Sequence, residues 1–157
     1  VKEKADVGIA FDGDADRVGF IDENGNRIGF DIVTALLGEH FLTKKGEKVL
    51  YDLRSSNVVN EHINSLGGEA VMSRVGHSYI KQIMRGQDII FGGELSGHYY
   101  FKANYFADSG LIAAIVLISL MVEKNKKLSE LVKPLNKYFQ SGEINSIVKY
   151  YKNNFIW

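Results

Sequence analysis

Cysteine does not occur among the 157 residues of the chain. Its absence excludes disulfide frameworks, thiolate metal sites and thiol nucleophiles, and it agrees with a reducing cytoplasm, where we expect the protein to be located. Proline occurs once, as Pro134, against 16 glycines, which indicates tight loops rather than a proline-rich linker. Net charge is also lacking, because Lys plus Arg and Asp plus Glu each total 19. Without a basic field, neither nucleic acid nor an anionic membrane is expected as a partner.

Long apolar runs are equally scarce. The longest, from Leu111 to Val122, falls short of the roughly 20 residues that a membrane-spanning helix requires, so we expect a buried core helix there. The first residues lack the apolar stretch and cleavage site of a secretory signal. The chain begins with Val1 rather than methionine, and we therefore expect an internal segment of a longer protein.

The hydropathy pattern alternates between strands and helices, and 45% hydrophobic residues suffice for a proper core. Predicted strands cover 7–11, 17–22, 27–30, 48–53, 70–73 and 88–92, and the tail 143–151 is expected to begin another. Predicted helices cover 32–42, 57–66, 78–84, 109–124 (capped by Asp108 or Ser109) and 128–139, with an interruption at Pro134. This alternation predicts an α/β fold with a mixed, largely parallel sheet flanked by helices. Residues 1–30 are expected to end one unit, and 31–140 to form a complete one.

Ligands of such sheets gather at the carboxyl ends of the strands. An acidic loop follows the first predicted strand, where Asp12, Asp14 and Asp16 alternate and can turn toward one point. Hard oxygen ligands suit Mg²⁺ or Ca²⁺, although a solvated acidic turn is the plain alternative. An EF-hand is rejected, because that loop requires glycine where Arg17 stands and helices where strands are predicted.

Three basic residues occupy neighbouring loops. Arg17, beside the acidic loop, is suited to gripping a phosphoryl group, or else forms an ordinary salt bridge to the aspartates. Arg54 follows a predicted strand, and its high pKa favours an electrostatic role over proton transfer. His77 precedes a predicted helix and can titrate near neutral pH, so it is the candidate general base. His40 and His62 lie on predicted helices and are interpreted as structural.

A glycine-flanked triad completes the candidates. Glu94, Ser96 and His98 alternate, so in an extended loop they face one side. A carboxylate, a hydroxyl and an imidazole are a fitting set for neighbouring sugar hydroxyls, and the flanking glycines allow close backbone approach. A glycine-rich turn with incidental polar residues is the alternative.

Taken together, these segments resemble the α-D-phosphohexomutase superfamily, which includes the phosphoglucomutases and phosphomannomutases. DGDADR, from Asp12 to Arg17, is similar to the family's magnesium loop, and GELSGH, from Gly93 to His98, is similar to its sugar-binding loop. YDLRSS resembles the strand end that carries a basic catalytic residue, where many members have lysine, and RVGHSYIK resembles another active-site loop. The four motifs occur in the family's order.

The resemblance implies a Mg²⁺-dependent interconversion of hexose 1- and 6-phosphates through a phosphoserine and a bisphosphate. It implies that Asp12, Asp14 and Asp16 hold Mg²⁺ together with a phosphoserine oxygen. Catalytic roles are implied for Arg17, Arg54 and His77. Glu94 and Ser96 are implied to bind the sugar's 3- and 4-hydroxyls, with His98 near the transferred group.

The resemblance also indicates what is missing. The family's segment with the phosphorylated serine and its final phosphate-clamping loop both contain proline. The single proline of this chain, Pro134, lies in neither kind of segment, so both are missing. Residues 1–30 then resemble the end of the second domain, 31–140 the third, and 141–157 a linker and the start of the fourth. The expected partners are a hexose phosphate and the remaining domains, and the segment alone is expected to be inactive. Leu95 favours glucose or mannose over glucosamine substrates.

Two other functions stay open. A haloacid-dehalogenase-type phosphatase would use Asp12 as its nucleophile, although its motif usually continues with Thr or Val where Asp16 stands. A non-catalytic module that binds metal or sugar phosphate is the second alternative.

Overall fold

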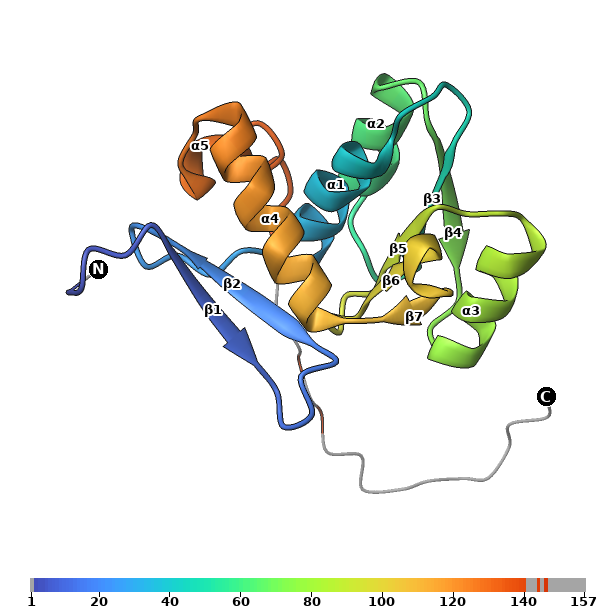
Figure 1. The fold of residues 1–157 in the computed structure, drawn as a ribbon, viewed down its shortest axis with the longest axis horizontal. Helices are drawn as coiled ribbons and strands as arrows, with labels where there is room; N and C mark the ends of the chain where they lie inside the picture. The colour runs from blue at the N-terminus through green and yellow to red at the C-terminus, as the bar shows by residue number, and fades with distance from the viewer. Residues whose placement is uncertain (1, 141–143, 145, 147–157) are drawn as a thin grey trace.

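The structure, a computed structural model, describes residues 2–140, 144 and 146. It begins with an antiparallel hairpin of β1 (Val7–Phe11) and β2 (Val18–Asp22), in which Val7 lies opposite Asp22. Both strands confirm the prediction. The hairpin lies beside α4 and is not hydrogen-bonded into the main sheet (Figure 1).

The turn predicted after β2 is present and is closed by a hydrogen bond from Asp22 N to Asn26 O, at 2.9 Å. The strand predicted over 27–30 is wrong, since Arg27 forms a single bridge to β2 and α1 (Phe30–Phe41) then begins. From that point the backbone amides bond within the helix instead of to β2.

The main sheet has five strands in the order β4-β3-β5-β6-β7. Its strands are β3 (Lys48–Asp52), β4 (Glu69–Ser73), β5 (Phe91–Gly93), β6 (Tyr99–Phe101) and β7 (Ala107–Asp108). β3 runs parallel to both of its neighbours, whereas β6 is antiparallel to β5 and to β7. The α/β class with a mixed sheet is confirmed, but β6 and β7 were not predicted. Both are short, and β6 is buried along its whole length, so neither shows the alternation that signals a strand.

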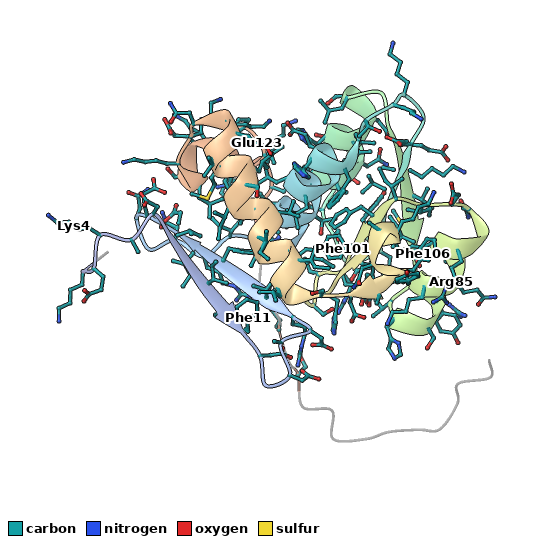
Figure 2. The ribbon with its side chains drawn as sticks, viewed as in Figure 1. Lys4, Phe11, Arg85, Phe101, Phe106 and Glu123 are labelled. Carbon is teal, nitrogen blue, oxygen red and sulfur yellow. The ribbon has the colours of Figure 1, made fainter. Side chains whose placement is uncertain are left out.

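Helices cover both faces of this sheet (Figure 1). The other helices are α2 (Val58–Ser65), α3 (His77–Gly86), α4 (Gly110–Lys124) and α5 (Leu128–Val132), with a 3₁₀ turn at Lys102–Asn104. α1, α2, α4 and α5 contribute to the larger core, and α3 packs on the opposite face with Leu50 and Tyr100. Phe101, labelled in Figure 2, lies in the larger core. Its ring packs edge-on against Phe41 and tilted against Phe91, with centroids 5.6 and 5.4 Å away.

The helix predicted over 109–124 is confirmed as α4, with the Ser109 hydroxyl accepting from Ile112 N at 3.2 Å. Its prediction as a buried core helix holds for one face only. One face is buried, but four apolar residues of the other face are 41–74% exposed: Leu111, Ile115, Ile118 and Val122. No helix of the described residues is long and apolar enough to cross a membrane.

The last predicted helix is shorter than expected. α5 ends at Val132, two residues before Pro134, rather than continuing to 139. Pro134 has no backbone N–H and cannot donate the next bond of the helix, so α5 ends here although Lys133 itself keeps helical geometry. The strand predicted over 143–151 lies outside the described residues apart from 144 and 146, which are not in a strand.

Candidate functional site

The acidic loop, residues 12–16, and the glycine-flanked loop, residues 93–98, meet at one place in the fold. Arg17 and His98 form an antiparallel bridge, and Val18 N donates to Gly97 O at 3.2 Å. His98 Nε2 also lies 3.3 Å from Asp16 Oδ2. Two segments about 80 positions apart in the chain therefore form one surface at the carboxyl end of β5.

Glycine is required where these segments touch. Gly97 has φ +92°, and a Cβ there would lie 2.9 Å from the ring of Phe30. A Cβ on Gly110, the first residue of α4, would lie 2.8 Å from Ala15 O and 3.0 Å from Arg17 O. The acidic loop thus rests directly on the start of α4, which places its carboxylates.

The three aspartates of the acidic loop converge. Asp12, Asp14 and Asp16 each offer a carboxylate oxygen within 4.8 Å of the others. Asp14 is exposed, and Oδ1 of Asp16 is buried without a hydrogen-bond partner among the described residues. An unpartnered buried carboxylate oxygen beside two further carboxylates fits a hard divalent cation such as Mg²⁺.

Arg17 neutralises part of this charge. Its Nε donates to Asp12 Oδ2 at 2.7 Å and lies 3.7 Å from Asp16 Oδ1. Desolvation would raise the pKa of Asp12, but the hydrogen bonds from Arg17 outweigh it and lower that pKa below its ordinary value. Asp12 therefore stays ionised, as a metal ligand must. The Arg17 side chain remains 51% exposed and can reach a ligand.

The polar side chains of the glycine-flanked loop are hydrogen-bonded to one another and to the fold. Ser96 Oγ lies 2.9 Å from His98 Nδ1, and Glu94 Oε2 lies 3.7 Å from the same nitrogen. Glu94 is only 3% exposed, and its Oε1 accepts from Gly76 N at 3.3 Å. The three residues are thus brought together as predicted, with Glu94 deeper than an extended loop would place it.

Arg54 follows β3 and is bound to a residue that the sequence did not single out. Asp52, fully buried at the end of β3, accepts from Arg54 Nη2 at 2.6 Å and from Leu95 N at 2.9 Å. One carboxylate therefore links the Arg54 loop to the glycine-flanked loop. The sequence did contain a signal for Asp52, because a charged residue near the end of an apolar strand is visible in YDLRSS.

His77 is the first residue of α3 and is exposed. In the part of the chain that the structure describes, its ring has neither a hydrogen bond nor an ion pair. The adjacent Gly76 contacts Glu94, so His77 belongs to the same edge of the sheet, but nothing couples it to the acidic loop.

Two further ionisable residues border the site. Lys81 of α3 lies 2.8 Å from Oδ1 of Asp108 in β7. Burial would raise the pKa of Asp108, but the hydrogen bond from Lys81 lowers it. Asp108 also lies within 4.8 Å of the ligand atoms of Asp16 and His98. Lys81 ends the RVGHSYIK segment and Asp108 was a possible helix cap, but neither was singled out as a site residue.

The chain is an α/β protein in which a carboxylate trio, two arginines and a polar triad gather at the carboxyl edge of the sheet. Residues 24–138 match the family model described as "Phosphoglucomutase/phosphomannomutase, alpha/beta/alpha domain III". The chain belongs to this family.

Relatives agree in sequence and in fold. A phosphomannomutase of Methanocaldococcus jannaschii is 48% identical over 94% of this chain, and one of Escherichia coli is 44% identical over 93%. A phosphoglucomutase/phosphomannomutase family structure from Burkholderia thailandensis, 31% identical, superimposes with a TM-score of 0.78 over 85% of this chain and 29% of its own. The chain spans 33% and 32% of the two phosphomannomutases, so it corresponds to about a third of such a protein.

Proposed function

We propose that the chain is the metal-loop and sugar-recognition part of a Mg²⁺-dependent phosphohexomutase, which interconverts hexose 1- and 6-phosphates through a phosphoserine and a bisphosphate. The contact between Asp16 and His98, at 3.3 Å, is the observation that carries the proposal. It joins a cation-compatible loop to a hydroxyl-compatible one, which is what transfer of a phosphoryl group to a sugar requires. Residues 1–30 would end a second domain, 31–140 form a third and 141–157 lead into a fourth.

In this proposal Asp12, Asp14 and Asp16 hold Mg²⁺, which supplies positive charge beside the transferred phosphoryl group. Arg17 extends from the same loop to the phosphoryl oxygens. Positioning and charge neutralisation account for most of the catalysis in such transfers.

The remaining residues act on the sugar. Arg54, tied to Asp52, supplies fixed positive charge and no proton transfer. His77 is exposed and without a partner in the described chain, which leaves it available as general base. Glu94 and Ser96 bind the 3- and 4-hydroxyls, and His98 lies near the transferred group.

A phosphatase of the haloacid-dehalogenase type is less well supported. Its nucleophile would be Asp12, but its motif usually continues with Thr or Val where this chain has Asp16. Residues 24–138 match a phosphoglucomutase/phosphomannomutase domain instead.

The test is an assay of the full-length protein with the 1-phosphates of glucose, mannose and glucosamine in the presence of Mg²⁺. We expect the full-length protein to convert glucose 1-phosphate and mannose 1-phosphate to the 6-phosphates. We expect the 157-residue chain alone to convert neither. Turnover by the 157-residue chain would contradict the division of the site among domains. Beryllofluoride trapped on Asp12 would overturn the mutase in favour of the phosphatase, and a full-length protein that binds hexose phosphates without converting them would favour a binding module.

A further inference from the structure

Two neighbouring tyrosines of β6 point to opposite faces of the sheet. Tyr99 lies in the larger core and Tyr100 in the core beneath α3, and neither is exposed. The Tyr99 hydroxyl donates to Phe30 O at 3.5 Å, away from the candidate site. The Tyr100 hydroxyl donates to Glu94 Oε2 at 2.6 Å. The function proposed above gives Tyr100 no role.

Glu94 depends on such donors because its carboxylate is buried. It is 3% exposed, and within the described residues no lysine or arginine pairs with it. The nearest basic group is the His98 ring, whose Nδ1 lies 3.7 Å from Oε2, so hydrogen-bond donors must replace the water that this carboxylate loses on burial. Gly76 N, the N-cap of the ten-residue helix α3, supplies one donor at the positive end of the helix. The Tyr100 hydroxyl supplies the other, shorter one.

Tyr100 is held firmly enough to orient its neighbour. Its ring packs against the His98 ring, with centroids 6.4 Å apart and planes 24° apart, and Lys81 Nζ lies 5.6 Å from its centroid on the α3 side. Burial and the Glu94 carboxylate raise the pKa of Tyr100 well above its ordinary value, so the hydroxyl keeps its proton and remains a donor.

We infer that Tyr100 is a positioning residue for sugar binding: its hydroxyl fixes the rotamer of the Glu94 carboxylate that receives the sugar hydroxyls. Each carboxylate oxygen accepts one hydrogen bond from the protein, from Gly76 or from Tyr100, and keeps a second lone pair for a ligand. The inference rests on the proposed function, since it assigns a partner to Glu94 in that role.

The test is a double-mutant cycle in the full-length protein, with Tyr100→Phe, Glu94→Gln and the double variant, and with Tyr99→Phe as matched control. Both tyrosine variants remove one hydroxyl from a buried ring and keep its packing. Because a hydrogen bond to a charged group is worth a few kcal/mol at most, we expect Tyr100→Phe to raise KM for glucose 1-phosphate roughly 5- to 10-fold. We expect kcat to change less than about 2-fold, because the lost interaction is equal in ground and transition states.

If Tyr100 acts through Glu94, the double variant has a KM no higher than Glu94→Gln alone. Tyr99→Phe is expected to leave both constants unchanged. Additive effects in the double variant, or equal effects of the two tyrosine variants, would assign Tyr100 a structural role and overturn the inference.

The cycle also separates the inference from the function beneath it. A raised KM for Glu94→Gln together with an unchanged KM for Tyr100→Phe defeats only the role of Tyr100. An unchanged KM for Glu94→Gln defeats the sugar-binding role of Glu94 itself, and the inference with it.

Discussion

The two loops that meet at the sheet edge differ in how completely their polar atoms are satisfied. In the acidic loop, Asp14 is exposed and Oδ1 of Asp16 has no hydrogen-bond partner in the described chain. In the glycine-flanked loop, the Glu94 carboxylate accepts a hydrogen bond from the Tyr100 hydroxyl. The His98 ring is within hydrogen-bonding distance of Ser96 Oγ and of Asp16 Oδ2. One loop retains unsatisfied negative charge, and the other is already internally paired.

The proposed function assigns a different ligand to each loop. A divalent cation replaces its water with protein oxygens, so a loop that holds one must keep oxygens free. Sugar hydroxyls are recognised by geometry, and groups held in place before binding lose less entropy when the ligand arrives. Two predictions test this contrast and a third concerns the scaffold outside both loops, in order from the largest expected effect to the smallest.

Asp14→Asn is expected to weaken binding of Mn²⁺, as a probe for Mg²⁺, more than about 100-fold while leaving the fold intact, because the proposed function makes Asp14 a metal ligand and its carboxylate has no hydrogen bond or ion pair among the described residues. Isothermal titration calorimetry measures the affinity. Asp6→Asn, an equal charge change at an exposed residue outside the loop, is the control. Equal affinities in the two variants would show that the trio holds no cation.

Asp52→Ala is expected to lower the free energy of unfolding by about 2–3 kcal/mol, because Leu95 N and the Arg54 loop lose their shared buried acceptor. Asp14→Ala, the same substitution in the acidic loop, is expected to stay within about 0.5 kcal/mol of the unsubstituted chain. Urea unfolding measures both. Similar losses would mean that the two loops do not differ in the way described above.

The smallest effect concerns the scaffold outside both loops. Glu39 of α1 pairs with His62 of α2 and with Lys124 of α4. Its pKa falls from 4.5 to about 2, mainly through the hydrogen bond from His62 and against the opposing effect of burial. Because the folded pKa is depressed, this stabilisation is complete above about pH 5 and is lost as the pH falls toward 2.

Allowing for solvent screening of a partly exposed group, we expect about 1 kcal/mol from this source. Between pH 6 and pH 3, the unsubstituted chain should therefore lose about that much more unfolding free energy than Glu39→Gln. Urea unfolding at the two pH values measures the difference. The control is Glu123→Gln, at a more exposed carboxylate of α4, which should lose as much unfolding free energy as the unsubstituted chain. Equal losses in the unsubstituted chain and both variants would show that Glu39 is not the source of the pH dependence.

Motif spacing predicted the candidate site better than hydropathy predicted the fold. The alternation of Asp12, Asp14 and Asp16 is a local property, and the structure brings their oxygens together. The short strands β6 and β7 escaped notice because they are formed by pairing with β5 rather than by a pattern of their own. Tyr100 therefore escaped notice with them, and Asp108 was considered only as a helix cap.

The sequence by itself singled out the candidate residues for the chemistry and most of the order of strands and helices along the chain, because loop spacing and hydropathy period are local. Tertiary structure alone decided which loops meet and which polar groups are buried. The contact of Asp16 with His98, the bridging position of Asp52 and the depth of Glu94 all depend on sheet order, and on the packing of the hairpin against α4. Those arrangements are set by hydrogen bonds and van der Waals contacts between distant segments, which no local pattern encodes.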